Sequence, residues 1–113
     1  MSQKVQEFNE YRSKMNEKIL ASDNKVIKRI FNLDTNAFKE GHLPIKTKEL
    51  LGLVASAVLR CDDCIAYHLK TAYENGVTKE EMMEAVHAGA AIESGATLVH
   101  GVQMMNKYNK LSM

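Results

Sequence analysis

Two thiols and one imidazole are spaced in this chain so that, in a helix, they would lie on one face. The two cysteines, Cys61 and Cys64, are separated by two residues, and His68 follows four residues after the second. In a helix these residues occupy positions i, i+3 and i+7, which lie on one side. A thiol pair beside an imidazole can carry out redox chemistry, bind a metal ion, or be buried as inert core.

Redox chemistry is the interpretation that these residue types favour. A cysteine reacts as the thiolate, and both a helix N-terminus and a nearby imidazolium lower the pKa of a thiol. We expect Cys61 and Cys64 in the first turn of a helix, with His68 one turn beyond. Asp62 and Asp63 oppose a thiolate by their charge, and we expect both to point away from the cysteine face.

A disulfide between Cys61 and Cys64 is plausible but requires an adjusted first turn. Residues at i and i+3 of a helix have Cβ atoms about 5–6 Å apart, whereas a relaxed disulfide needs roughly 3.5–4.5 Å. A bond under strain is more easily reduced, which suits a disulfide that opens and closes. The chemistry to expect is thiolate attack on a peroxide or disulfide, followed by capture of the product by the second thiol.

Two other interpretations of the same residues stay open. A zinc site needs four ligands, and the C-x-x-C-x-x-x-H stretch supplies three, so His87 or His100 would have to be the fourth. Neither histidine belongs to a familiar ligand spacing, and we expect each to be a polar group at a helix contact. The third interpretation is an inert thiol pair in the core.

The composition narrows the class of protein. With 113 residues the chain is expected to form one domain, residues 1–113. Its net charge is +1, and the sequence contains no basic run of the kind that binds nucleic acid. The longest apolar run, residues 50–59, is too short to span a membrane. The polar N-terminus does not resemble a secretory signal, so we expect a cytoplasmic protein, where a C-x-x-C pair is more often catalytic or metal-binding than structural.

The apolar residues recur at steps of three and four, and no stretch alternates like a strand. We therefore predict an all-α fold of about six helices in a compact single domain.

The second helix follows the N-cap cluster at 22–24, with a possible interruption near Asn32, and Gly41 takes its C′ position before Pro44. A Thr78–Glu81 capping box opens the fifth helix. The predicted helices are Gln3–Ala21, a second ending near Gly41, Lys48–Arg60 after Thr47, Cys61 to about Asn75, one from Thr78 to about Ile92, and a last one carrying Leu98, Val99, Val102, Met105 and Tyr108 after a break at Glu93–Gly95.

The helix Lys48–Arg60 has almost no polar face, so we place it at the centre of the fold or at a subunit interface. The inner face of the next helix carries Cys61, Cys64 and His68 together with Ile65 and Leu69. The thiols should therefore be shielded from solvent.

These residues resemble a known family. The segment with Glu49, the C-x-x-C-x-x-x-H stretch twelve residues on, and Asn75–Glu81 is similar to the core of the carboxymuconolactone decarboxylase superfamily, and more narrowly to its alkylhydroperoxidase D-like branch. The likeness covers about residues 23–105. It implies the helical fold of that branch.

The resemblance also implies a function. Cys64 would attack the peroxide, Cys61 would resolve it as an intramolecular disulfide, and Glu49 with His68 would form a proton relay. The substrate would be a hydroperoxide or a disulfide, and an external thiol would be the reductant, with no metal or organic cofactor. Members of the family assemble as homo-trimers or hexamers, and this chain's apolar helices agree with a homo-oligomer.

One position departs from the family. The best-known members carry a histidine directly before the second cysteine, where this chain has Asp63. An aspartate there raises the thiol pKa and places the rate of peroxide reduction, and the substrate, in question. The alternatives to a peroxidase are a lyase that acts on a small lactone or keto acid through Glu49 and His68, and a non-catalytic oligomer with a structural or zinc-binding thiol pair.

Overall fold

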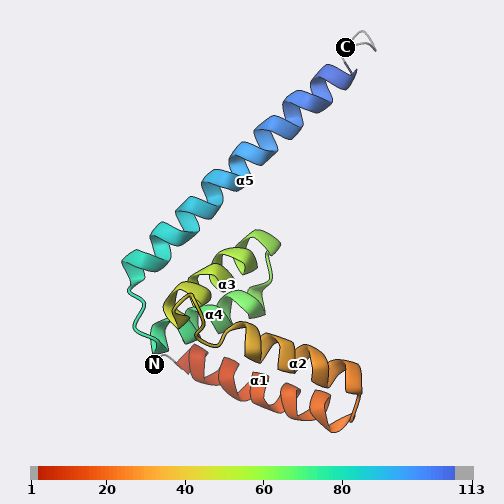
Figure 1. Cartoon of the computed structure of the whole chain (residues 1–113), viewed down its shortest axis with the longest axis vertical. Coiled ribbons are helices and arrows are strands. Elements are labelled where there is room, and N and C mark those ends of the chain that lie inside the picture. The colour runs from red at the N-terminus through yellow and green to blue at the C-terminus, as the bar shows by residue number, and fades with distance from the viewer. Residues whose placement is uncertain (1–2, 109–113) are drawn as a thin grey trace.

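The computed structural model describes residues 3–108, without the side chains at positions 97, 98, 101 and 104–108. This part of the chain contains helices and no strand, so the predicted all-α class is confirmed. The helices are α1 (Gln3–Ala21), α2 (Lys25–Ala37), α3 (Ile45–Leu59), α4 (Asp62–Glu74) and α5 (Lys79–Tyr108). Figure 1 shows α1 and α2 side by side, α3 beside α4, and α5 extending away from the other four.

The N-cap cluster predicted at 22–24 is confirmed. The Asn24 side chain accepts hydrogen bonds from the backbone N–H groups of Val26 (2.9 Å) and Ile27 (3.1 Å), which otherwise have no partner within the helix. Asp23 turns the chain with a φ of 54°. The result is a tight hairpin in which α2 runs back along α1.

The segment between α2 and α3 differs from the prediction. The second helix is uninterrupted at Asn32 and ends at Ala37, four residues before Gly41, so Gly41 is not its C′ residue. The Lys48 ammonium replaces a glycine cap by donating to the carbonyls of Ala37 (2.9 Å) and Lys39 (2.6 Å). The third helix begins at Ile45, before the predicted start at Lys48, because Pro44 has a φ of −66° that suits the residue before a first turn.

The predicted capping box is confirmed at the start of α5. The Thr78 N–H donates to Glu81 Oε1 (2.8 Å), and the Glu81 N–H donates to Thr78 Oγ1 (3.1 Å). Hydrogen bonding of the Glu81 carboxyl to the Thr78 backbone N–H, and secondarily to the Thr78 side chain, lowers the pKa of that carboxyl from its ordinary value.

The predicted break at Glu93–Gly95 is wrong, and the described chain has five helices where about six were expected. A single glycine inside a helix costs only about 1 kcal/mol, and no proline or capping residue accompanies Gly95 to stop the helix. The predicted fifth and sixth helices are therefore one. Of the apolar residues predicted for the last helix, Val99 and Val102 are exposed, and the side chains of Leu98, Met105 and Tyr108 lie outside the described part.

The predicted central position of the third helix is confirmed, because α3 packs against both α4 and α5. Close packing to α5 is possible because Gly89 faces Val54: a Cβ added at Gly89 would lie 2.6 Å from Val54 Cγ1. The buried apolar residues are few among those described, namely Leu53, Ala72 and Val77. The radius of gyration of 18.7 Å exceeds the roughly 13 Å of a compact chain of this length, since α5 reaches beyond its neighbours. Within residues 3–108 no helix is long and apolar enough to cross a membrane.

Candidate active site

The site is built where α3 ends and α4 begins. Only two residues, Arg60 and Cys61, separate these helices. Arg60 adopts the left-handed conformation (φ 58°, ψ 40°), and the Cys61 N–H donates to the Ser56 carbonyl at 3.1 Å. This is a Schellman-type ending in which arginine stands where glycine is usual, and a left-handed non-glycine residue costs on the order of 1 kcal/mol. The turn sends α4 back along α3.

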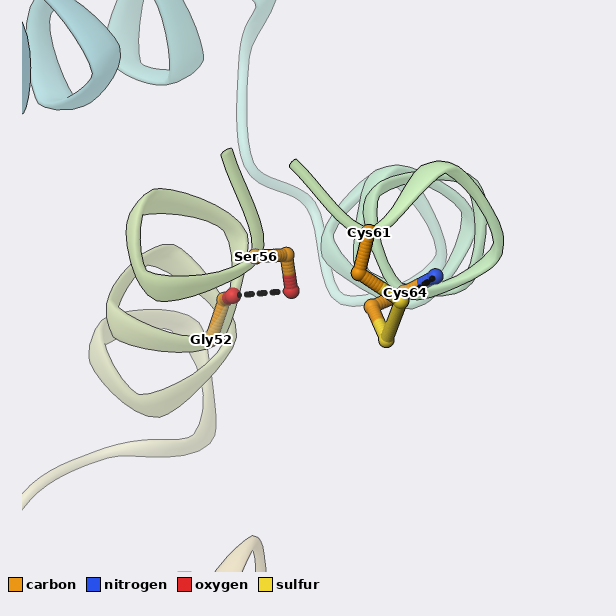
Figure 2. Close-up of a disulfide and its surroundings, with 4 residues drawn as sticks. All are labelled: Gly52, Ser56, Cys61 and Cys64. Atoms are coloured by element: carbon orange, nitrogen blue, oxygen red, sulfur yellow. Dashed lines mark hydrogen bonds between the residues drawn. A yellow bond between two sulfur atoms is a disulfide. The ribbon is translucent and has the colours of Figure 1, made fainter. Parts of the chain in front are cut away.

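The cysteines lie at the N-terminal end of α4, and they form a disulfide. Cys61 is the N-cap residue with an extended backbone (φ −92°, ψ 99°), so it stands outside the helix and not within its first turn. The Cα atoms of the pair are 5.2 Å apart, within the normal range for disulfides, and the bond closes with Cys61 outside the first turn of the helix. Cys61 Sγ also accepts a hydrogen bond from the Cys64 N–H at 3.3 Å (Figure 2).

The prediction that the thiols are shielded holds for one of them. Cys61 is half-buried, while Cys64 is exposed. Cys64 is exposed because it lies at the N-terminal end of α4, where fewer residues cover a side chain than along the buried face of the helix. In Figure 2 the Ser56 side chain lies on the side of α3 that faces the disulfide, and its hydroxyl donates to the Gly52 carbonyl at 2.6 Å.

Glu49 and His68 meet in the interface between α3 and α4. Both side chains are buried, and His68 Nδ1 lies 2.8 Å from Glu49 Oε2. Thr71, one turn after His68, donates its hydroxyl to the same carboxylate oxygen. Two donors therefore orient one buried carboxylate, and the imidazole is fixed with Nδ1 committed to it. This leaves Nε2 as the ring nitrogen that can exchange a proton with another group.

The imidazole is tightly surrounded. The ring centroids of Phe38 and Tyr67 lie 4.9 Å and 5.2 Å from that of His68. A Cβ added at Gly52 would lie 2.7–2.9 Å from three atoms of the ring. Glycine is thus needed at position 52 because the imidazole lies directly against the α3 backbone, which fixes its position.

A cavity of about 300 Å³ opens beside these groups. Cys64 and His68 line it together, with Asp63 and Tyr67 from the same helix. Its other walls come from α1 and α2, as Arg12, Ile30, Phe31 and Asp34. Asp62 and Asp63 are both exposed as expected, and Asp63 also lines this cavity with Cys64. A larger cavity of about 410 Å³ between α1 and α4 contains no predicted site residue.

The two other histidines lie apart from this arrangement. His87 and His100 are both exposed, contrary to the prediction that each occupies a helix contact. Among the residues that the structure describes, no three His, Cys, Asp or Glu side chains gather in a way that could hold a metal ion.

The structure therefore brings together Glu49, His68 and the Cys61–Cys64 pair, which are the residues singled out from the sequence. It adds Thr71, Gly52, Tyr67 and Arg12, which sequence reasoning missed. Thr71 carried a usable signal, since it lies one turn after His68 on the same face. Gly52 carried another, as a glycine inside an otherwise apolar helix often marks a close approach.

Residues 24–107 match the carboxymuconolactone decarboxylase family. The chain belongs to this family. A crystal structure of a Thermotoga maritima protein superposes with a TM-score of 0.74 at 39% identity, covering 94% of this chain and 96% of the other. A second structure of that protein (TM-score 0.70, 38% identity, 91% and 95% covered) is described as a carboxymuconolactone decarboxylase family protein, and its description raises involvement in an antioxidative response as a possibility.

The curated relatives match over shorter stretches. The chain is 36% identical over 63 residues to an uncharacterized protein of the cox locus of Paracoccus denitrificans, covering 56% of this chain and 57% of the relative. It is 33% identical over 66 residues to the alkyl hydroperoxide reductase AhpD of Corynebacterium aurimucosum, covering 58% of this chain and 37% of the relative. The match thus spans less than two thirds of either relative's length.

Gly52→Ala tests the close contact between α3 and the imidazole. The added methyl group overlaps the His68 ring, so the ring must move and its contact with Glu49 must loosen. We expect a loss of about 1–3 kcal/mol in the free energy of unfolding and a changed NMR environment for the His68 ring. Gly41→Ala is the control, because its Cβ would meet only Lys48 Nζ at 3.6 Å. Equal stability of the two variants would contradict the close contact.

Proposed function

We propose that this protein is a thiol-dependent peroxidase, or more broadly a thiol–disulfide oxidoreductase, that reduces hydroperoxides through Cys64 and Cys61. The observation that carries the proposal is the juxtaposition in one cavity of an exposed cysteine, already paired in a disulfide, and an imidazole held by a buried carboxylate. Similarity to a protein named alkyl hydroperoxide reductase supports it.

In the oxidative half of the cycle the Cys64 thiolate attacks the terminal oxygen of the hydroperoxide. The O–O bond breaks, and the alkoxide leaves as an alcohol after it receives a proton. Cys64 is then a sulfenic acid, and the Cys61 thiol displaces its hydroxyl group as water to close the disulfide. Two thiols and one hydroperoxide thus give one disulfide, one alcohol and one water. The disulfide between Cys61 and Cys64 supports this closing step.

The role proposed for Glu49 and His68 is to hold and deliver the proton. With Nδ1 committed to Glu49 Oε2, His68 can take the Cys64 thiol proton on Nε2 and return it to the leaving oxygen. Thr71 and Glu49 are positioning residues in this scheme. Because the carboxylate is buried and bonded to two donors, the imidazole does not have to be reoriented during the reaction.

The reductive half of the cycle needs an external thiol. We place its attack on Cys64, because Cys64 is exposed and Cys61 is half-buried. Attack on the Cys64 sulfur breaks the disulfide and releases Cys61 as the thiolate, which the Cys64 N–H at the end of α4 can stabilise. A second thiol then frees Cys64 from the mixed disulfide. Because the cycle depends on thiol reductants, the cytoplasm is the compartment that we propose.

A homo-oligomer, a trimer or a hexamer, is also part of the proposal. Large apolar side chains are exposed along α3 and α5, and the second half of α5 extends beyond the other helices. A second copy of the chain would bury such surfaces. The exposed apolar residues on these two helices are Leu51, Val58, Leu59, Met83, Ile92, Val99 and Val102.

The first prediction concerns the thiols. One equivalent of cumene hydroperoxide should remove two hydrogens from the mass of the reduced protein. Cys61→Ser should instead stop at a Cys64 sulfenic acid, and Cys64→Ser should form no intramolecular disulfide and lose peroxide turnover. Intact-mass spectrometry of the three proteins measures this. If both thiols of the native protein remain unoxidised, the peroxidase proposal is contradicted. If Cys64→Ser keeps full activity on a lactone or keto acid, a lyase that uses Glu49 and His68 is favoured instead.

The second prediction concerns the reductive half. The oxidised protein, treated briefly with limiting 2-mercaptoethanol and quenched with acid, should carry the adduct on Cys64. Trypsin cuts after Arg60 and Lys70 and so releases both cysteines in one peptide, in which fragmentation locates the adduct. An adduct that accumulates on Cys61 would reverse the proposed roles of the two sulfurs in this step.

The third prediction concerns assembly. Light scattering coupled to size exclusion should give a mass several times the 12.7 kDa of the chain. Ile92→Glu on α5 should lower that mass, because it places a charge in the proposed contact. Leu33→Glu on α2, at a residue of similar exposure (69% against 76%), is the matched control and should leave the mass unchanged. A monomeric native protein contradicts the proposal.

A further inference from the structure

Helix α1 precedes the segment that matches the family, yet it supplies one residue to the candidate site. The Arg12 guanidinium carbon lies 3.6 Å from the centroid of the Tyr67 ring. Tyr67 directly precedes His68, and Arg12 lines the same cavity as Cys64 and His68. The stacking holds the guanidinium at the cavity, because a cation over an aromatic face is attracted by the ring.

Arg12 and Asp63 line the same two cavities. Both line the cavity that contains Cys64, and both also line a neighbouring cavity of about 250 Å³ under α1. Asp63 is the residue whose charge disfavours a thiolate at the adjacent Cys64, and a guanidinium that lines the same cavity can offset that effect.

The charges that face Cys64 can be counted element by element. Helix α2 contributes the carboxylate of Asp34 and α4 contributes that of Asp63, both in the cavity wall. The Glu49 carboxylate of α3 does not line this cavity and has His68 and Thr71 as its hydrogen-bond partners. Among the cavity-lining residues Arg12 is the one side chain that stays cationic throughout the pH range in which thiols titrate. The titratable or charged groups around Cys64 are thus Arg12, Asp34, Glu49, Asp63, Tyr67 and His68.

We propose that Arg12 is a positioning residue of this site, held on Tyr67 so that its charge offsets Asp34 and Asp63 at the cavity that contains Cys64. The inference deepens the proposed function, on which its purpose rests: the reduced Cys64 must be a thiolate to attack a peroxide. Without Arg12 two carboxylates would face the sulfur, and both the thiolate and any anionic reagent would be disfavoured.

Alkylation of the fully reduced protein tests this inference without any peroxide. Iodoacetamide is neutral and iodoacetate is an anion of similar size, so the ratio of their rates with Cys64 reports the local charge, and the pH dependence with iodoacetamide reports the thiolate. Arg12→Gln should move the pH profile of Cys64 upward and lower the iodoacetate-to-iodoacetamide ratio by about three- to tenfold. Added salt should reduce that difference between variant and native protein.

The matched variants separate charge from structure. Arg12→Lys keeps a charge without the planar stacking and should fall between the native protein and Arg12→Gln. Arg29→Gln removes an exposed arginine of α2 that does not line the cavity, and it should behave as the native protein. None of these changes touches the core, because α1 contains no buried residue and Arg29 is exposed.

An Arg12→Gln variant with the native pH profile and the native reagent ratio would overturn the inference, as would an equal effect of Arg29→Gln. Failure of the peroxidase proposal has a different signature. In that case Cys64 alkylates with the predicted dependence on Arg12, while hydroperoxide leaves both thiols untouched.

Discussion

The contact between His68 Nδ1 and Glu49 Oε2, 2.8 Å long and buried, is the interaction on which the site depends. It joins α3 to α4 at a point where neither helix could leave a charged group unpaired. Removing one partner leaves the other buried without its hydrogen bond, which is destabilising by about 1–3 kcal/mol. Two neighbouring residues support this contact: Gly52 leaves room for the His68 ring, and the Thr71 hydroxyl is the second donor to the Glu49 carboxylate.

The short connection between α3 and α4 determines where the sulfurs lie. Because Arg60 turns the chain through a left-handed conformation, α4 starts at Asp62 and Cys61 becomes its N-cap. An extended N-cap residue brings the first sulfur to the second without distorting the helix. The same geometry leaves Cys64 exposed and gives Cys61 the hydrogen bond from the Cys64 N–H.

Much of this arrangement could be predicted from periodicity and spacing. Helix type, the capping residues Asn24 and Thr78, and the grouping of the thiol pair with His68 follow from local patterns. The grouping of Glu49 with His68 is implied by the resemblance to the family and not by spacing alone. The features that the sequence did not predict depend on contacts between residues far apart in the chain or on a conformation without a local signal. Lys48 capping α2 requires a contact across 11 residues, and the left-handed Arg60 carries no glycine to signal it. Arg12 could not be linked to the site, because no local rule places α1 over α4.

The proposed mechanism divides the site into a buried half and an exposed half. The proposed proton transfer needs fixed geometry, and Glu49, His68 and Thr71 are hydrogen-bonded within the α3–α4 interface. The proposed thiol chemistry needs access for a peroxide and a reductant, and Cys64 is exposed at the N-terminal end of α4. Asp63 directly precedes that cysteine and lines the same cavity. The buried carboxylate of Glu49 has its two hydrogen-bond partners within the interface, whereas the proposed counter-charge to Asp63 is the Arg12 guanidinium held on Tyr67.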